Sequence, residues 1–254
     1  MRYRVSVVNQ NLTNSFPDKT PQEIKTLQHN FYRHFCDIMV ESFKIFSISE
    51  SDAKARFKVL NPELLNSYYN KGQSVLLVGG HYNNWEMLAV GLDSYIDHQS
   101  VAIYHRLGNK FMNDKALKSR SKYGLKMISR QEVKDYFAQF TGLTVTIFGA
   151  DQSPSIAKKV YWMEFLNQDT PVMFGVEKFA IEKNTPVIFG GITKVKRGHY
   201  EFKMEVLIED PSQCGHGDIT EAHTKRLEKQ IIADPQYWLW THKRWKRKRQ
   251  PGDD

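Results

Sequence analysis

The chain has 254 residues, of which 41% are hydrophobic, 13% aromatic and 25% charged. This length suits one large α/β domain or two small ones, and the apolar share is large enough for a packed core, so wholesale disorder is excluded. The formal net charge of +8 indicates anionic partners, such as an acidic protein, a phospholipid surface or a nucleic acid.

The cysteine content and the hydropathy exclude two further classes. Cys36 and Cys214 are far apart and match no metal-ligand spacing, so neither a disulfide framework nor a cysteine-based zinc site is expected. No signal peptide is recognisable at the start of the chain. The apolar runs are all shorter than the roughly 18 residues that a membrane-spanning helix needs. The chain as given is therefore not expected to cross a membrane.

The first strong pattern is a long amphipathic helix across residues 18–46. Thr20, Pro21 and Glu23 provide an N-cap, a first-turn proline and the acid of a capping box. This aromatic-rich helix is expected to pack on the domain core, and a lipid-facing role is the alternative. Its apolar side chains recur at steps of three and four residues: Ile24, Leu27, Phe31, Phe35, Ile38, Met39, Phe43 and Phe46.

From residue 74 onward, short apolar runs alternate with helical segments. Buried strands are expected at 74–80, 101–105, 143–150 and 186–192, with helices near 83–94, 109–123 and 130–140. This alternation predicts an α/β fold, in which helices cover the faces of a central sheet. Residues 198–210 alternate apolar and polar side chains, which predicts a later, half-exposed strand. A final helix follows and ends before Pro235.

No repeat, linker or domain boundary is recognisable, so a single domain spanning residues 1–254 is expected. It would comprise an N-terminal amphipathic helical region (1–50), an α/β core with the active site (74–208), and a C-terminal helix with a basic, tryptophan-rich tail (218–250).

The tail sequence WLWTHKRWKRKRQ mixes cations with tryptophans. This mixture suits an anionic membrane surface, where indoles settle at the level of the headgroups. It equally suits RNA, DNA or an acidic protein, and a third interpretation is a solvated basic tail whose tryptophans are in the core. The cations are Lys243, Arg244, Lys246, Arg247, Lys248 and Arg249, and the tryptophans are Trp238, Trp240 and Trp245.

A candidate site follows the first strand of the core, where LLVGG leads into HYNNWEML. The carboxyl ends of strands are where α/β sheets form clefts, so the position of His81 favours a ligand site. Within one helix, side chains five residues apart diverge by about 140°. His81 and Glu86 therefore converge only if His81 lies in the turn and Glu86 lies early in the helix.

In that arrangement Glu86 would hold the imidazole of His81 and leave its other ring nitrogen free as a base. Gly79 and Gly80 would let the backbone approach a substrate, and nearby N–H groups could stabilise an oxyanion. The alternative is a structural histidine that caps the helix, with Glu86 solvated near the positive helix end.

Other chemistries have little support in the sequence. The spacing of His81 and Glu86 is not the i,i+4 pair of a zinc protease, and no third ligand is evident, so no metal is expected. Neither cysteine lies at a strand-to-helix elbow, and the chain contains no G-x-S-x-G, Walker or G-x-G-x-x-G sequence. What remains is a general base that activates a substrate hydroxyl without a covalent enzyme intermediate.

The segment GGHYNNWEML resembles the His-x4-Asp/Glu signature of bacterial lipid A biosynthesis acyltransferases, which are related to glycerophosphate acyltransferases. Four later segments resemble those of the family, in the family's order: IYHRLGNKFMNDKALKSRSKYG, FGADQSP, EFLNQDTPVMFGVEKFA and PQYWLWTHKRWKRK. This ordered set is more specific than the histidine–acid pair alone. The resemblance implies a glycerophosphate-acyltransferase-like single domain, with a mixed, mostly parallel central sheet flanked by helices.

The resemblance also implies an activity: transfer of a fatty acyl chain from acyl carrier protein, or from acyl-CoA, to a hydroxyl of a lipid A precursor. The reaction would take place at the cytoplasmic face of the inner membrane and need no cofactor. A basic surface suits both acyl carrier protein and an anionic glycolipid, and no nucleic acid partner is expected. Family members usually begin with a hydrophobic anchor, which the chain as given does not show, so peripheral attachment is expected.

Within this family framework, His81 is the general base and Glu86 its partner. Arg106 or Arg120 would bind phosphate or assist the active site, or would be surface cations only. Asp151 and Gln152 would lie at the edge of the cleft, or would only cap a helix and bond a loop. Structural or interfacial roles are expected for Trp238, Trp240, His242, Arg244 and Trp245.

Three alternatives stay open. The acceptor could be another glycolipid or an amino-acid-derived lipid. The protein could bind nucleic acid through its tail, although this leaves the pairing of His81 with Glu86 unexplained. It could also be a non-catalytic, lipid-binding relative of the enzymes.

Overall fold

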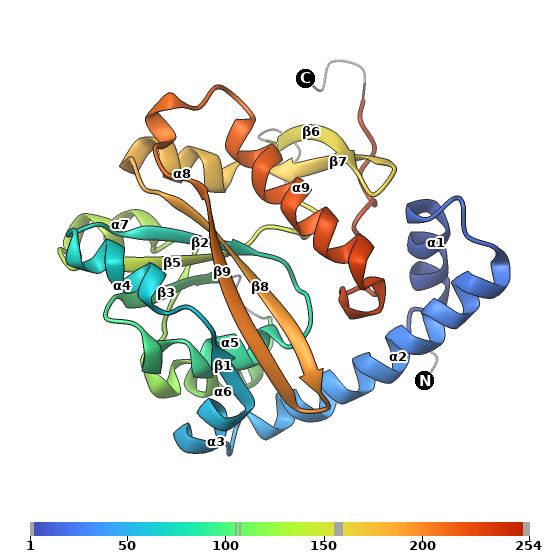
Figure 1. Cartoon of the computed structure of the whole chain (residues 1–254), viewed down its shortest axis with the longest axis horizontal. Coiled ribbons are helices and arrows are strands. Elements are labelled where there is room, and N and C mark those ends of the chain that lie inside the picture. The colour runs from blue at the N-terminus through green and yellow to red at the C-terminus, as the bar shows by residue number, and fades with distance from the viewer. Residues whose placement is uncertain (1–2, 105, 107, 155–159, 251–254) are drawn as a thin grey trace.

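A mixed sheet forms the centre of the protein (Figure 1). The computed structural model describes residues 3–104, 106, 108–154 and 160–250, and seven strands of this part form the sheet in the order β1-β9-β8-β2-β5-β3-β4. The strands from β8 to β4 are parallel to one another, whereas β9 is antiparallel to β8 and parallel to β1. The expected mixed, mostly parallel sheet is therefore confirmed. The strands are β1 (Phe57–Val59), β2 (Val75–Gly79), β3 (Gln99–Tyr104), β4 (Lys126–Ser129), β5 (Thr144–Gly149), β8 (Val187–Lys196) and β9 (His199–Ile208).

Helices cover both faces of the sheet, as the alternating sequence pattern predicts. They are α1 (Val5–Ser15), α2 (Pro21–Lys44), α3 (Glu50–Arg56), α4 (Glu63–Asn70), α5 (Trp85–Gly91), α6 (Lys110–Arg120), α7 (Val133–Gln139), α8 (Gly175–Lys183) and α9 (Asp218–Ala233). A separate antiparallel hairpin, β6 (Val160–Phe165) with β7 (Gln168–Met173), has no counterpart among the expected elements. His105, the last residue of the strand expected at 101–105, lies outside the described residues. Within the described part, every helix is too short or too polar to cross a bilayer.

The central strand β2 is buried on both faces, which explains its unbroken apolar sequence. Because successive side chains of a strand point to opposite faces, Leu76 and Val78 enter one core and Val75 and Leu77 enter the other. The first core also contains residues of α1, α2, α8, α9 and the tail, and the second contains residues of α3, α4 and α5.

Helix α2 packs on the core along only part of its apolar stripe. The expected capping box is present, because the Thr20 hydroxyl accepts a bond from the Glu23 N–H and the Glu23 carboxylate accepts one from the Thr20 N–H. The stripe is buried from Ile24 to Ile38, which confirms core packing for this part. Beyond it, Phe43 is 71% exposed and Phe46 is 45% exposed. The end of α2 therefore presents aromatic side chains to the surroundings.

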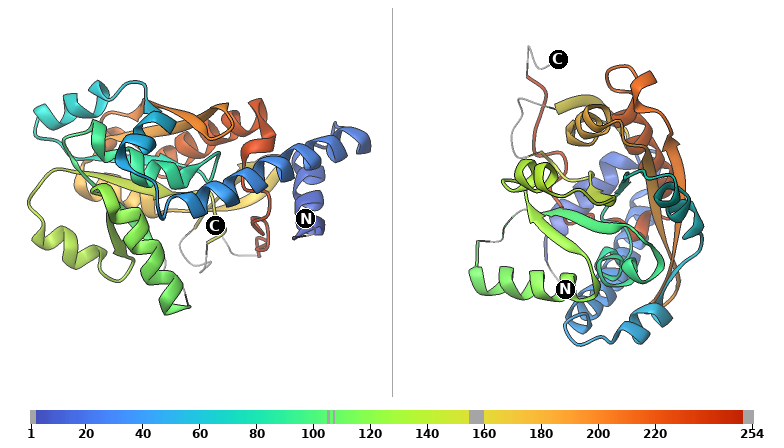
Figure 2. Two further views of the ribbon diagram at one scale, coloured as in Figure 1. Left: turned by 90° about the horizontal axis from the view of Figure 1, so that it is seen from below. Right: turned by 90° about the vertical axis from the view of Figure 1, so that its left-hand side faces the viewer.

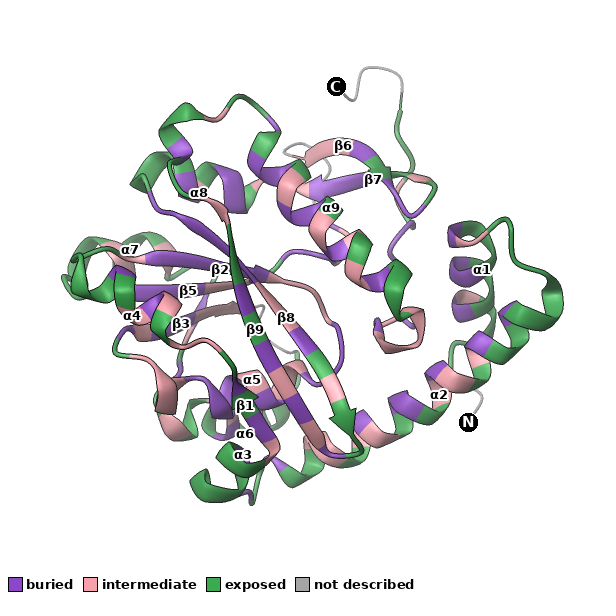
Figure 3. Ribbon diagram, in the orientation of Figure 1, coloured by how far each residue is buried: buried purple, intermediate pink, exposed green. Residues whose placement is uncertain are grey.

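The three tryptophans of the tail are buried. Trp238, Trp240 and Trp245 are 2%, 0% and 8% exposed, and Figure 3 shows buried segments where the tail follows α9. The indoles of Trp238 and Trp240 meet edge to face at 4.7 Å, and the indole N–H of Trp245 donates to the Thr170 hydroxyl at 2.7 Å. Indoles enclosed in this way reach neither lipid headgroups nor nucleic acid bases. The tryptophans are therefore in the core, as the third interpretation expected, whereas the partners of the tail's cations stay a prediction.

Candidate active site

The candidate site begins at the turn between β2 and α5. β2 ends at Gly79 and α5 begins at Trp85, so His81 lies in the turn and Glu86 in the first helical turn, as expected from their spacing. Asn84 caps α5 through its side-chain oxygen, which accepts a bond from the Met87 N–H at 3.1 Å. Helix geometry thus fixes where Glu86 points.

Hydrogen bonds hold this turn in a single conformation. Asn83 has a left-handed φ of 53°, and its side-chain amide donates to the Ile192 carbonyl at 2.8 Å. The N–H groups of His81, Tyr82 and Asn83 donate to the Asp151 carboxylate, the Gly80 carbonyl and the Tyr237 carbonyl, respectively. The expectation that N–H groups of the turn could stabilise an oxyanion is therefore wrong for these three.

Asp151 is the residue that holds the imidazole of His81. Its Oδ1 is 2.6 Å from Nδ1 of the ring, and its Oδ2 accepts bonds from the His81 N–H and the Trp238 indole N–H, both at 2.8 Å. The pairing follows from the sheet, because Gly79 of β2 and Gly149 of β5 are register partners. His81 and Asp151 each lie two residues beyond that pair, at the carboxyl edge of neighbouring parallel strands.

Glu86 has a different partner from the one expected. Its carboxylate forms a two-bond ion pair with Arg120, with distances of 2.8 Å to Nε and 2.5 Å to Nη2. This follows from the fold, because Arg120 ends α6 beside α5. The expectation that Glu86 orients the imidazole is corrected on this point: Asp151 does so, and Glu86 adds a negative charge nearby.

Burial and charge act in opposite directions on this pair. Burial lowers the pKa of the His81 imidazole, but the charge and hydrogen bond of Asp151, together with the charge of Glu86, more than offset this and raise that pKa above its ordinary value. Burial raises the pKa of Asp151, yet the charge of His81 and the hydrogen bonds from His81 and Trp238 hold it well below its usual range. Asp151 is therefore the ionised partner at neutral pH.

The other ring nitrogen of His81 faces a pocket. Since Asp151 accepts the bond of Nδ1, the neutral ring carries its proton there, and the lone pair of Nε2 accepts a hydrogen bond from the Gln152 amide. The Gln152 amide nitrogen lies 3.3 Å from Nε2, and the Trp85 ring packs edge-on at 5.2 Å. Gly149 makes room for the ring, because a Cβ there would lie 3.1 Å from the His81 Cε1 atom.

The pocket has both polar and apolar lining residues and a volume of about 470 Å³. This is within the usual range for small-molecule sites. Its polar lining comes from His81, Glu86, Arg120, Arg130 and Gln152. None of the described residues that line it is a serine, threonine or cysteine. The apolar lining includes Leu88, Ala89, Ala102, Ile103, Leu125, Met127, Ile147, Phe148, Ile192 and Phe202.

Arg106, the remaining predicted site residue, lies away from the pocket. Arg106 is exposed and pairs with Glu132 at 3.2 Å, and it is not among the described residues that line the pocket. Of the two candidate arginines, the structure places Arg120 at the site. Sequence reasoning missed Arg130, which also lines the pocket, and gave Trp238 no contact with the His81–Asp151 pair.

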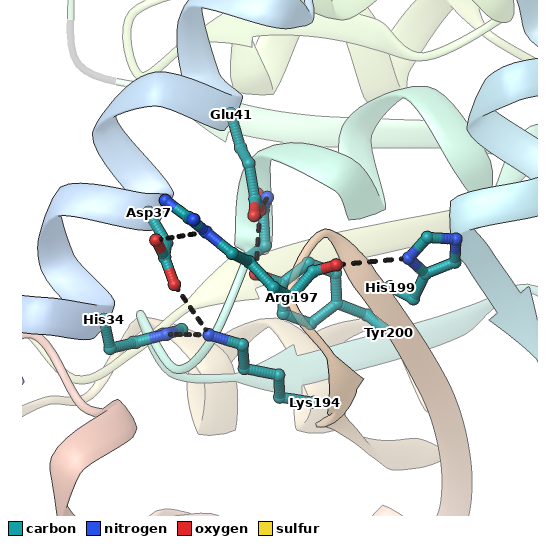
Figure 4. Close-up of polar contacts among 8 residues, drawn as sticks. His34, Asp37, Glu41, Lys194, Arg197, His199 and Tyr200 are labelled. Atoms are coloured by element: carbon teal, nitrogen blue, oxygen red, sulfur yellow. Dashed lines mark hydrogen bonds and ion pairs between the residues drawn. The ribbon is translucent and has the colours of Figure 1, made fainter. Parts of the chain in front are cut away.

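Helix α2 braces the turn between β2 and α5 from outside. Figure 4 shows the polar side chains that join it to the β8–β9 hairpin, where Asp37 pairs with Lys194 at 3.1 Å and Glu41 accepts a bond from the Tyr200 hydroxyl at 2.7 Å. The same Glu41 oxygen accepts a bond from the Asn84 amide at 2.7 Å. The helix cap of α5 is thereby tied to both α2 and the hairpin.

The fold and the site together define a class of protein: an α/β protein with a histidine–aspartate pair, able to act as a general base, beside a largely apolar pocket. The family model for the bacterial lipid A biosynthesis acyltransferases matches residues 2–247. The chain therefore belongs to this family, as the resemblance implied, and membership implies acyltransferase activity in lipid A biosynthesis. A search of the curated proteins found no match.

Proposed function

We propose that the protein transfers a fatty acyl chain from acyl carrier protein to a hydroxyl of a lipid A precursor, with His81 as the general base. The observation that carries the proposal is the His81–Asp151 pair, in which the unprotonated ring nitrogen, Nε2, faces a largely apolar pocket. The absence of serine, threonine and cysteine from the described pocket lining favours a direct displacement over an acyl-enzyme intermediate. An apolar pocket of this size suits an acyl chain.

The reaction would proceed in one displacement. His81 Nε2 takes the proton of the acceptor hydroxyl as its oxygen attacks the thioester carbonyl, which forms a tetrahedral oxyanion. The C–S bond then breaks, the ester forms, and the departing thiolate receives the proton from His81. The guanidinium of Arg120 lines the pocket beside His81, so it can stabilise the oxyanion or bind a phosphate of the acceptor.

We also propose peripheral attachment to the cytoplasmic face of the inner membrane, and exposed apolar side chains support attachment to a bilayer. In both views of Figure 2, α6 projects away from the body of the protein. Phe111 and Met112, in its first turn, are 67% and 49% exposed, and Lys110 and Lys115 lie beside them in the helix. Exposed apolar side chains flanked by lysines suit an anionic bilayer surface. The exposed end of α2, with Phe43, provides a second apolar contact.

The function is tested by incubating the full chain with lipid A precursors and a fatty acyl thioester of either acyl carrier protein or coenzyme A as the donor. Mass spectrometry should show one added acyl group on one precursor, and faster transfer from the carrier protein. Exclusive use of coenzyme A would reject the proposed donor. Transfer to other glycolipids or to amino-acid-derived lipids alone would reject the acceptor, and no transfer to any lipid would favour a non-catalytic relative.

Attachment is tested by flotation with anionic phospholipid vesicles. Phe111→Asp should reduce the bound fraction severalfold, because it places a charge where an apolar side chain enters the bilayer. Ile232→Asp is the matched control, since Ile232 is 57% exposed on α9. Equal loss in both variants, or no loss in either, would reject this surface.

A further inference from the structure

A buried cation lies behind the catalytic pair. Arg244 is 1% exposed, and its Nη2 donates to the Pro171 carbonyl at 2.8 Å. Its Nε and Nη1 are buried and have no hydrogen-bond partner among the described residues. A guanidinium enclosed with unmet donors carries a large desolvation cost, because arginine remains charged in proteins. Such donors need an acceptor.

A small cavity adjoins this guanidinium. It measures about 10 Å³, which is close to the space that one water molecule occupies. Its lining includes Arg244, Asp151 and His223, together with the backbone-rich end of β2 at Gly79. The Nε2 atom of His223 is a second buried polar atom with no partner among the described residues. The walls thus offer several groups that one water could bond.

Asp151 has the capacity to accept one more bond. A carboxylate offers about four lone-pair sites, two on each oxygen. Oδ2 already accepts bonds from the His81 N–H and the Trp238 indole, whereas Oδ1 bonds only Nδ1 of His81 in the described structure. Asp151, which can accept one more bond, and Arg244, which has unmet donors, line the same small cavity.

We propose that this cavity binds one water molecule that links Arg244 to Asp151, and that Arg244 is a positioning residue for the His81–Asp151 pair. The cation stabilises Asp151 as a carboxylate from the side opposite the imidazole. The linked water completes the hydrogen bonds of the carboxylate, so its oxygens stay aimed at His81. The part that concerns catalysis rests on the proposed function, whereas the water and the charge effect do not.

The charge of Arg244 also acts on the proton of the pair. A nearby positive charge disfavours protonation, so its removal should raise the pKa of His81. The other charges around the pair are unchanged in a variant that lacks Arg244. Glu86 and Arg120 pair with each other, Arg130 lines the pocket, and Lys246 lies in the tail. Burial lowers the pKa of both His223 and His242 to about 4, so these two are neutral near pH 7.

The spectroscopic test is an NMR titration of the His81 imidazole in the full chain. Arg244→Met should raise its pKa by about one unit. Arg244→Lys, which keeps the charge, should stay close to the wild-type value. Trp245→Phe is the matched control, because it removes a buried hydrogen bond of the same tail, to Thr170, without changing a charge. That control should lower stability and leave the titration unchanged.

A crystal structure of the wild-type chain provides the second test, and it decides the matter if Arg244→Met does not fold. It should show an ordered water within hydrogen-bond distance of both Arg244 and Asp151. A dry cavity overturns the proposal. So does an unchanged His81 titration in a folded Arg244→Met variant. Because neither readout requires acyl transfer, both remain valid if the proposed enzymatic function fails.

Discussion

The two sides of the His81 ring show how burial separates the roles of two carboxylates. On the inner side, the Asp151 side chain is 2% exposed and is bonded by fixed donors of the protein. On the pocket side, the Glu86 side chain is 15% exposed and pairs with Arg120, which is 33% exposed. A carboxylate enclosed by the protein can only hold the ring, whereas the more open pair can also meet a substrate.

Of the substitutions that distinguish the two sides of the His81 ring, Asp151→Asn should have the largest effect on acyl transfer. Transfer should fall by about 10³-fold or more, because an amide at this position favours the wrong tautomer of the imidazole. Steady-state assays with mass detection would measure the loss. Asp169→Asn is the control, since Asp169 is an exposed aspartate that pairs with Arg249. A fully active Asp151→Asn variant would show that the inner carboxylate does not position His81.

Glu86→Gln should have a smaller effect, a loss of about 10- to 100-fold. It removes the partner of Arg120 and one negative charge near His81 but leaves Nδ1 bonded to Asp151. Arg120→Gln should cost a similar factor, and the double variant should lose less than the product of both, because the two side chains form one ion pair. If Glu86→Gln is as inactive as a variant without His81, Glu86 is a direct partner of the base after all.

On the inner side of the ring, Trp238→Phe should have the smallest effect on acyl transfer. It removes the indole donor of Asp151 and should lower the free energy of unfolding by about 1.5–3 kcal/mol. It should also slow transfer by a few-fold, since Asp151 is held less firmly. Trp240→Phe is a matched control: its indole donates to the Pro235 carbonyl, so stability should fall without a specific loss of rate. Equal rate losses in both variants would indicate a packing effect only.

The sequence predicted the sheet and the position of the turn that carries His81, for physical reasons that the structure preserves. Gly79 and Gly80 end an apolar run that is buried on both faces, and the spacing of His81 and Glu86 set the turn and the helix start. The partner of His81 required knowledge of strand order. Only the pairing of β2 with β5 brings Asp151 beside His81, and no local pattern reveals that two distant strands are neighbours.

Composition was a poor guide to which aromatic segments are exposed. Trp240, in a strongly basic tail, is fully buried, whereas Phe111 in α6 and Phe43 at the end of α2 are largely exposed. The tail is enclosed because its indoles pack on one another and on Phe165 of the β6–β7 hairpin. That hairpin has no strong periodic signal in the sequence, so the surface that buries the tail could not be anticipated.

The pH dependence of acyl transfer should follow the pKa of His81, which Asp151 raises from the inner side of the ring. His81 must be neutral to accept a proton, so the rate should fall as the pH drops through its raised pKa, which lies above the ordinary value of 6.5. The raised pKa of His81 makes the free energy of unfolding depend on pH in the opposite direction to the rate. Because the folded state binds this proton more tightly than the unfolded chain, the added stability is present below pH 6.5 and is lost as the pH rises through the raised pKa.

The most direct test of the central claim is the single-turnover rate of acyl transfer by wild type and by His81→Ala, measured across this pH range with the donor and acceptor bound. We expect the wild-type rate to rise with pH to a plateau, and the rate of His81→Ala to be lower by about 10³-fold or more at every pH. A His81→Ala variant that is folded and transfers the acyl group at the wild-type rate would contradict general-base catalysis by His81.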